Sequence, residues 1–394
     1  MFGATPLDEG LVEFRVWAPR AKRVSVLGQE LAPEDDGVFA GRLEARPGDD
    51  YRYRLDGGDE WPDPCSRFQP EGVLGPSRIV DTRAFDIRPG PGVTLEDLVI
   101  YELHVGTFTP EGTFDAAIPR LEALRDAGLT AVELMPVATF PGNRGWGYDG
   151  LYNWAPHPTY GGPDGLARFV DAAHAAELAV ILDVVYNHVG PGDEALSSFG
   201  PYFTTRHETF WGKAIDYTQR PVREWAIQNA ELWTRDYKID GLRLDAVHAI
   251  FDDESPVHVL KELRERVDGF LIDEMEIGDL RPIEEWGHDA QWEDTLHHEL
   301  HVLLTDEHEG YYADYGSAEG VKRELERSNP RFVACAQNHD QVGNRAVGDR
   351  LPPDKDRIAL LTVLLSRDTP LVFMGEEYGE TRPFQFFSDH IDPF

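Results

Sequence analysis

In residues 1 to about 85, apolar and polar positions alternate with a period of two. This is the pattern of strands that have one buried face and one exposed face. Clusters of Gly, Pro and Asp residues separate the alternating runs and indicate turns. The pattern predicts a small N-terminal β-sandwich over residues 1–88, and the proline-containing stretch 85–92 reads as a linker. The clearest alternating positions are Val12, Phe14, Val16, Val24, Val26, Tyr51, Tyr53 and Leu55.

From Leu98 onward, short apolar runs alternate with stretches in which apolar residues recur every three or four positions. The short runs are typical of buried parallel strands, and the longer stretches are typical of amphipathic helices. Eight strands joined by helices are the count of a (β/α)8 TIM barrel, an α/β fold, which we expect over residues 93–394. The predicted helices include 116–127, 166–176 and 223–237. The predicted strands are 98–105, 131–137, 180–186, 241–247, 270–273, 290–292, 332–336 and 371–374.

The chain reaches Phe394 soon after the eighth apolar run. We therefore expect no C-terminal β domain and no final helix to seal the barrel between its first and eighth strands. The outer faces of the strands near 98–101 and 371–374 should then be poorly covered. Residues 384–387 should pack near the barrel mouth or the N-terminal domain, because large apolar side chains are unfavourable in contact with water. The large apolar residues of this final segment are Phe384, Phe386, Phe387, Ile391 and Phe394.

The charge balance excludes several classes of partner. The chain has 37 basic and 72 acidic residues, a formal net charge of −35 at pH 7. Such a surface repels nucleic-acid phosphates and anionic membrane lipids, whereas a neutral sugar meets no such barrier. No apolar stretch approaches the length of a membrane span and no signal-peptide pattern follows Met1, so we expect a cytoplasmic protein. The sequence does not indicate the oligomeric state.

No residue spacing points to a metal or a cofactor. Cys65 and Cys335 lie far apart and fit no metal-binding or redox motif, so we expect two free thiols. The pair His297 and His298 could suggest a metal site, but neighbouring positions on a helix point in different directions. We therefore expect that the protein uses neither a metal nor a cofactor.

Polar side chains cluster at the ends of four predicted barrel strands. The working residues of such barrels project from the carboxyl ends of strands, so these side chains should meet at one face. A single strand-end aspartate is often only a helix cap, but groups after the third, fourth, fifth and seventh strands form a set. In that order they are Asp183, Asn187 and His188; Arg243, Asp245 and His248; Glu274; and His339 and Asp340.

These residues suit the cleavage of glycosidic bonds. That reaction needs one carboxylate to attack or stabilise the anomeric carbon and a second carboxyl group to protonate the leaving oxygen. Asp245 alternates in phase with Arg243, which can hold it ionised. Glu274 follows an apolar strand, where partial burial favours the protonated form that a general acid needs. His188 and His339 can donate hydrogen bonds to sugar hydroxyls.

These motifs resemble the four signature regions of the α-amylase family of glycoside hydrolases. The resemblance implies that Asp245 is the nucleophile, Glu274 the acid/base and Asp340 the transition-state stabiliser. In the stretch 146–150, Tyr148 is placed to stack on the sugar at the cleavage point. The resemblance also implies supporting and substrate-binding roles for Asp183, Asn187, His188, Arg243, His248 and His339.

Further stretches are similar to the malto-oligosyltrehalose trehalohydrolases within that family. They are 62–70, 101–108, 133–137, 292–312 and 384–390. The similarity implies retaining hydrolysis of the α-1,4 bond next to the terminal trehalose unit of maltooligosyl trehalose or a related α-glucan. Two alternatives stay open. One is a glycogen-branching enzyme, which transfers the glycosyl unit to another glucan, and the other is an inactive glucan-binding fragment.

One position departs from the family pattern. Asp273 precedes Glu274, where the family usually has alanine. Strand alternation predicts that Asp273 points to the outside of the barrel, whereas Glu276 lies in phase with Glu274 and competes with it as the acid. We expect Asp245 and Glu274 to face each other at the separation of about 5–5.5 Å that retaining glycosidases require.

Overall fold

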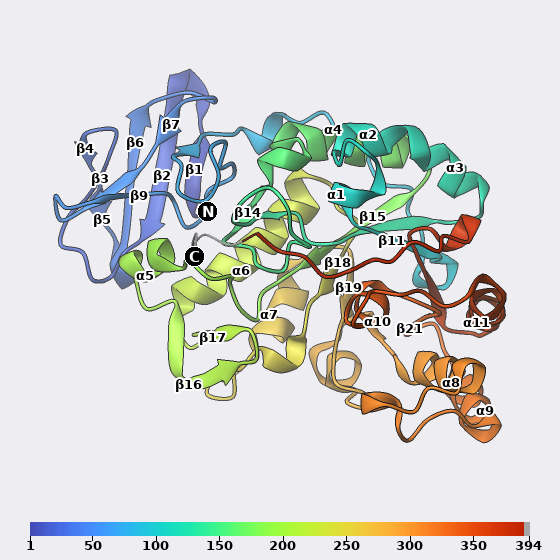
Figure 1. Cartoon of the computed structure of the whole chain (residues 1–394). Helices are drawn as coiled ribbons and strands as arrows, with labels where there is room; N and C mark the ends of the chain where they lie inside the picture. The colour runs from blue at the N-terminus through green and yellow to red at the C-terminus, as the bar shows by residue number, and fades with distance from the viewer. Residues whose placement is uncertain (390–394) are drawn as a thin grey trace.

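The N-terminal part of the computed structural model contains two antiparallel four-stranded sheets, as the alternating pattern predicts (Figure 1). The structure describes residues 1–389. The inward positions of the alternating runs form the core, in which Phe14 and Tyr53 are fully buried. One sheet is β1 (Gly3–Pro6), β2 (Leu11–Trp17), β6 (Val38–Glu44) and β5 (Ala32–Pro33); the other is β4 (Gln29–Glu30), β3 (Val24–Val26), β8 (Tyr53–Leu55) and β9 (Glu60–Trp61); β7 (Asp50–Tyr51) pairs with β10 (Ser77–Arg78).

Eight parallel strands form a closed barrel, which confirms the predicted TIM-barrel fold. Strand β22 pairs with β11 to complete the ring. Alternate side chains fill its interior, among them Ile100, Ile181, Ile272 and Leu371. The strands are β11 (Ile100–Leu103), β12 (Ala131–Leu134), β15 (Ala179–Val184), β18 (Gly241–Leu244), β19 (Phe270–Asp273), β20 (Ala290–Trp292), β21 (Phe332–Cys335) and β22 (Thr369–Phe373).

Helices cover the outside of the barrel (Figure 1). In α4 (Gly162–Ala175), the residues Leu166, Phe169, Val170 and Ala173 recur every three or four positions and form its buried face. The predicted helix 116–127 is interrupted at Pro119, which lies in a 3-10 turn and has no N–H to continue an α-helix. The other helices are α1 (Val105–Phe108), α2 (Phe114–Ala117), α3 (Leu121–Asp126), α5 (Glu194–Phe199), α6 (Arg220–Glu231), α7 (Val259–Arg266), α8 (Thr295–Thr305), α9 (Ala318–Arg327), α10 (His339–Gly343) and α11 (Pro353–Leu365).

The outer faces of the first and eighth barrel strands are covered, so the expectation of poor coverage is wrong. Tyr101 on β11 is fully buried against Phe108, with ring centroids 6.0 Å apart, and its hydroxyl donates to Glu377 at 2.7 Å. Val372 on β22 is buried, and α11 lies against β21 and β22. Helix α11 itself carries four exposed apolar side chains: Ile358, Leu361, Leu364 and Leu365.

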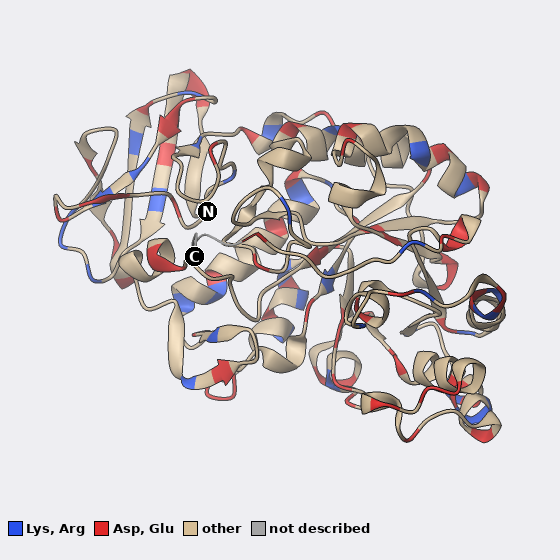
Figure 2. Cartoon of the chain, in the orientation of Figure 1, with Lys and Arg blue, Asp and Glu red and all other residues tan. Residues whose placement is uncertain are grey.

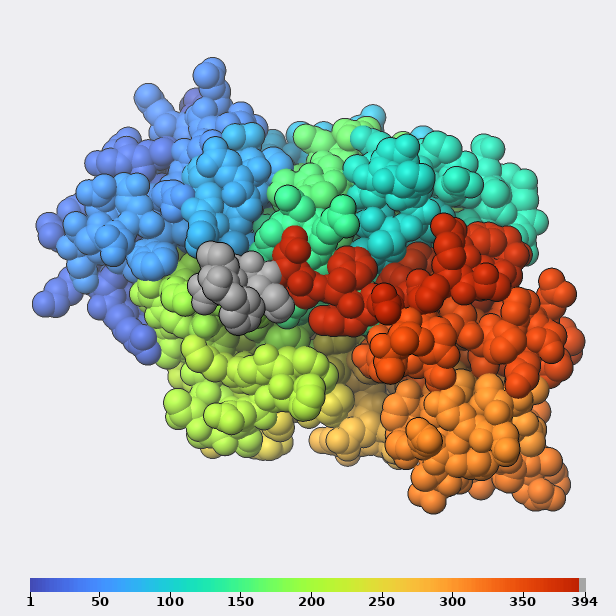
Figure 3. Space-filling view, viewed as in Figure 1, coloured from blue at the N-terminus to red at the C-terminus, as the bar shows by residue number. Residues whose placement is uncertain are grey.

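The segment after β22 packs against the loop between β13 (Ala138–Thr139) and β14 (Tyr152–Pro156), at the mouth of the barrel. Figure 3 shows the red end of the chain beside green and teal residues. Phe384 is buried and stacks on Trp146, with ring centroids 5.0 Å apart. The carboxylate of Asp389 accepts hydrogen bonds from the main-chain N–H groups of residues 143 and 144 at 2.9 and 3.0 Å. The predicted packing is confirmed for Phe384, whereas Phe386 stays 57% exposed. Ile391 and Phe394 lie outside the described residues.

The stretch 62–70 makes hydrogen bonds with both the N-terminal sheets and the barrel. The carboxylate of Asp63 is fully buried and accepts hydrogen bonds from the Tyr51 hydroxyl at 2.7 Å and the Cys65 N–H at 2.8 Å. A main-chain oxygen of this stretch accepts a hydrogen bond from Trp225 of α6 at 3.4 Å. Burial raises the pKa of Asp63 to about 6. Both donors nevertheless need an acceptor at this position, because buried polar groups are costly when unpaired.

Acidic side chains are spread over both the N-terminal sheets and the helices around the barrel (Figure 2). Within residues 1–389, no helix is long and apolar enough to cross a membrane. Cys65 and Cys335 are both buried and unpaired, which confirms the prediction of two free thiols.

Asp63→Ala should lower the free energy of unfolding by about 2–4 kcal/mol, because two buried donors lose their acceptor. Urea unfolding of the purified chain measures this change. The exposed Asp59 serves as the matched control, and Asp59→Ala should leave the unfolding midpoint unchanged. An Asp63→Ala variant as stable as the unmodified chain would show that Asp63 does not hold this connection together.

Candidate active site

A single buried arginine at the end of β18 binds three of the predicted carboxylates. The Nη1 atom of Arg243 donates to Asp183 at 2.8 Å and to Asp245 at 2.9 Å, and its Nη2 atom donates to Glu274 at 2.7 Å. The guanidinium plane lies over the ring of Trp292, 4.2 Å from the ring centroid. The predicted alternation of Arg243 and Asp245 is confirmed, since both side chains enter the same cluster. Residues from β15, β18, β19 and β20 thus meet at one point.

The backbone after Asp245 takes an unusual conformation. Ala246 has φ 41° and ψ 53°, the left-handed region that non-glycine residues rarely adopt. This conformation accompanies an N–H that donates to Glu274 Oε2 at 2.9 Å. Glu274 therefore receives one hydrogen bond from Arg243 and one from the residue next to Asp245. Strain of this kind persists where the surroundings fix it, and it clusters at functional sites.

Asn187 and His188 extend the cluster on the β15 side. The Nδ2 atom of Asn187 donates to both the main-chain oxygen and the Oδ2 atom of Asp245, each at 2.8 Å. The His188 ring bonds to the Asn187 side chain and stacks on Trp211, with centroids 5.6 Å apart. Burial lowers the pKa of His188, so the ring is neutral at pH 7. The His248 ring also lies near Trp211, with centroids 6.3 Å apart.

Tyr148 and His339 form the side of the cluster that faces β11 and β12. The Tyr148 hydroxyl donates to Asp183 at 2.6 Å and lies 2.8 Å from His339 Nε2, and the two rings stack with centroids 5.1 Å apart. His339 Nε2 also lies 3.5 Å from Asp340 Oδ1. Burial raises the pKa of Asp183 to about 7, against the opposing effect of Arg243. The structure therefore brings together nine of the ten predicted site residues, and His248 reaches them through Trp211.

The two other acidic residues near Glu274 in the sequence lie outside the Arg243 cluster. Asp273 is fully buried and bonds to His288 Nδ1 at 2.5 Å, and His288 Nε2 bonds to the main chain of Leu260 on α7. Asp273 thus points between strand and helix, as the alternation predicts. Glu276 is exposed. Among these three acidic residues, only Glu274 contacts Arg243.

Sequence reasoning missed four residues that the structure places at the site. Trp292 is the last residue of β20, and Asp294 lies two positions later. Strand alternation places both in phase with the inward side of β20, but the sequence analysis used this stretch only as part of the family resemblance. Burial, together with the charges of Glu274 and Asp340, raises the pKa of Asp294 to about 7. Trp211 lies on the hairpin of β16 (Phe203–Thr209) and β17 (Gly212–Ile215), and no period in the sequence links that loop to the site. The fourth is Glu102, which bonds to His339.

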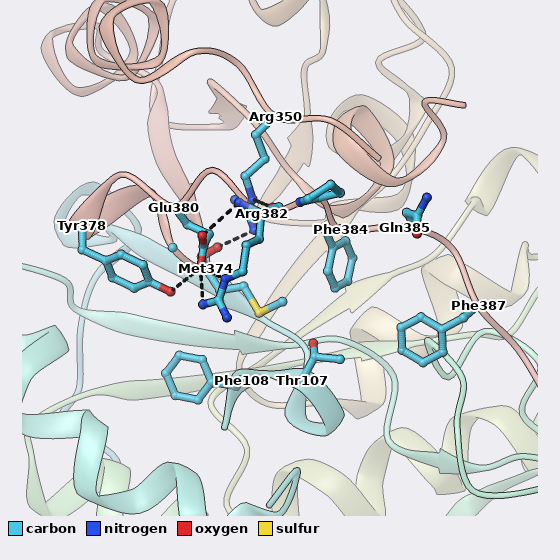
Figure 4. A pocket seen from close by; sticks show the side chains of 12 residues that line it. Thr107, Phe108, Arg350, Met374, Tyr378, Glu380, Arg382, Phe384, Gln385 and Phe387 are labelled. Atoms are coloured by element: carbon cyan, nitrogen blue, oxygen red, sulfur yellow. Dashed lines mark hydrogen bonds and ion pairs between the residues drawn. The ribbon is translucent and has the colours of Figure 1, made fainter. Parts of the chain in front are cut away.

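A cavity of about 380 Å³ lies between α1 and the segment after β22 (Figure 4). Phe108, Tyr378 and the ion pair of Glu380 with Arg382 line it. None of the candidate catalytic carboxylates does. In the described part of the chain, no group of three or more His, Cys, Asp or Glu residues could hold a metal ion.

Comparison with known proteins agrees with this geometry. The profile "Alpha amylase, catalytic domain" matches residues 75–210, and the profile "Carbohydrate-binding module 48 (Isoamylase N-terminal domain)" matches residues 1–67. A crystal structure of a Salmonella typhimurium protein described as "Putative alpha Amylase" superposes with a TM-score of 0.91 at 39% identity. That match covers 99% of this chain and 75% of the Salmonella chain.

Two named relatives separate the alternatives. A 1,4-alpha-glucan branching enzyme from Salinibacter ruber is 32% identical, over 62% of this chain and 46% of its own. The malto-oligosyltrehalose trehalohydrolase of Saccharolobus solfataricus is 44% identical, over 98% of this chain and 77% of its own. The second likeness is both higher and nearly complete along this chain, so the chain belongs to the malto-oligosyltrehalose trehalohydrolases of the α-amylase family.

Proposed function

We propose that this protein hydrolyses the α-1,4 bond next to the terminal trehalose unit of maltooligosyl trehalose, and so releases trehalose. The observation that carries the proposal is the single guanidinium of Arg243 bonded to Asp183, Asp245 and Glu274. The names of two relatives that match 98% of this chain supply the substrate. A neutral glucan also suits a chain whose net charge of −35 repels anionic partners.

In the proposed reaction, the carboxylate of Asp245 attacks the anomeric carbon while Glu274 gives its proton to the leaving glycosidic oxygen. The bond to the trehalose unit breaks, and the remaining maltodextrin becomes an ester of Asp245. Glu274 then takes a proton from water, whose oxygen attacks the anomeric carbon and frees Asp245. Two displacements retain the α configuration. Arg243 positions both carboxyl groups, because it donates to one oxygen of Asp245 and anchors Glu274 at one oxygen only.

Asp340 serves as the proposed stabiliser of the positive charge that develops on the sugar ring. Its carboxylate accepts one hydrogen bond, from Asn344 at 3.1 Å, and lies beside His339. Tyr148 offers the sugar an aromatic face next to these groups. The proposed substrate-binding set is Tyr148, Asp183, Asn187, His188, Arg243, His248 and His339.

The proposed division of the chain places a carbohydrate-binding-like sandwich at residues 1–88 and the catalytic barrel at residues 93–394. The match of a carbohydrate-binding profile to residues 1–67 supports this division. Residues 62–70 form hydrogen bonds with both the sandwich and the barrel, and through them the sandwich also contacts and stabilises α6.

Incubation with maltooligosyl trehalose should release trehalose and a shorter maltodextrin, which chromatography of the products measures. Proton NMR of the fresh reducing end should show the α anomer first, because two displacements retain configuration. Formation of branched glucan would favour the branching enzyme, and the absence of any product would favour an inactive glucan-binding protein. A first-formed β anomer would contradict the covalent route through Asp245.

Asp245→Asn should reduce trehalose release at least 100-fold, roughly 3 kcal/mol of barrier, because only the attacking charge is lost. Glucan binding, measured by calorimetry, should persist. Activity above one-hundredth of that of the unmodified enzyme would overturn the assignment of the nucleophile.

Glu274→Gln should reduce turnover of maltooligosyl trehalose by about 100-fold or more, because the amide has no proton to give to the leaving oxygen. Glu276→Gln is the matched control, since Glu276 is exposed two positions away, and it should leave kcat within twofold. The reverse pattern in steady-state kinetics would make Glu276 the acid.

A further inference from the structure

Both carboxylate oxygens of Glu102, on β11, bond to one residue. Oε2 accepts the main-chain N–H of His339 at 2.9 Å, and Oε1 lies 2.6 Å from His339 Nδ1. Glu102 is fully buried and His339 is 1% exposed. A carboxylate facing the ring nitrogen at this distance requires that Nδ1 carries a proton. Glu102 therefore fixes both the position and one protonation site of His339.

The other ring nitrogen of His339 faces a hydroxyl whose proton is already used. Tyr148 donates its only hydrogen to Asp183 at 2.6 Å, so it accepts from His339 Nε2 at 2.8 Å. Arg243 donates to the same oxygen of Asp183, and its positive charge favours the ionised carboxylate that accepts the tyrosine hydrogen. With Nδ1 and Nε2 both protonated, the His339 ring is a cation.

The charges that face His339 come from several strands. Burial alone would lower the pKa of His339, but the charges of Asp340 and Glu102 and the hydrogen bond to Glu102 raise it to about 10. Arg243 opposes this rise. Glu133 and Asp183 add further carboxyl groups within electrostatic range. The nearby His104 has its pKa lowered to about 4 by burial, so it is neutral at pH 7.

We propose that Glu102 is a positioning residue that holds His339 as a buried cation against Tyr148 and Asp340. This inference rests on the proposed function, because it assigns the cation to the site where Asp245, Glu274 and Asp340 act. A fixed positive ring offsets part of the negative charge of that cluster. It also gives Tyr148 a donor that keeps its ring stacked and its hydroxyl directed to Asp183.

The neighbouring strand supplies a matched control. Glu133 pairs in register with Glu102 and is equally buried, but neither of its side-chain oxygens has a hydrogen-bond partner among residues 1–389. Burial and the charge of Glu102 raise the pKa of Glu133 well above its ordinary value. Glu133→Gln removes a carboxyl group from the same layer of the barrel without removing a bond to His339.

The test is a pH titration of His339 by NMR in the full chain labelled at histidine, with His339→Gln identifying its signals. In the unmodified protein, both ring nitrogens should stay protonated from pH 6 to 8. Glu102→Gln should lower the pKa of His339 by more than about one unit, and kcat for trehalose release should fall about 10- to 100-fold, with a smaller change in KM. Glu102→Asp should recover part of both, and Glu133→Gln should leave His339 protonated.

Several results would overturn the proposal. A His339 ring that is neutral at pH 7 in the unmodified protein would show that Asp183 or Tyr148 holds the proton instead. An unshifted titration in Glu102→Gln would show that Glu102 does not control the ring. If Glu102→Gln fails to fold, Glu102→Asp and the unmodified protein still decide the point. Failure of the proposed function is distinct, because it would appear as absent trehalose release whatever the state of His339.

Discussion

The ion cluster around Arg243 is the interaction on which the rest of the site depends. A buried guanidinium is costly to desolvate, and the cost is offset only if its hydrogen bonds are satisfied. Here carboxylates from three strands accept from Arg243, and the Trp292 ring covers its face. Removal of Arg243 would leave these carboxylates close together without the donor that they share. The cluster thus joins the ends of β15, β18 and β19 through one side chain.

The same cluster holds two chemically similar carboxylates in different environments, which suit the two roles that we propose for them. Asp245 is held from both sides, by Arg243 at one oxygen and by Asn187 at the other. Glu274 keeps one oxygen free of protein hydrogen bonds within the described chain, because Arg243 and Ala246 both bond to Oε2. The free oxygen can carry the proton that a leaving group needs. The left-handed backbone at Ala246 links the two residues, because it lies directly after the proposed nucleophile and its N–H donates to the proposed acid.

Much of the fold and most of the site could be predicted from the sequence, for physical reasons. Buried parallel strands need continuous apolar runs, so all eight strands were visible, and polar residues at their carboxyl ends had to converge. Contacts made by loops carry no such period, and Trp211 on the β16–β17 hairpin was therefore missed. Glu102 was missed because an acidic residue in an apolar strand shows no partner in sequence. The closure of the barrel was misjudged at Tyr101, since the short helix α1 and the Glu377 turn cover a face that was expected to need a final helix.

The central claim is that the carboxylate of Asp245, which Arg243 holds in place, attacks the substrate. A fluorinated α-glucosyl fluoride, whose electron-poor ring slows hydrolysis of the covalent intermediate, tests it directly by trapping the glycosyl-enzyme. Peptide mapping by mass spectrometry then locates the sugar. The label should lie on Asp245 and should be absent when that residue is asparagine. A label on Glu274 or Asp340, or an active enzyme that never becomes labelled, would contradict this account.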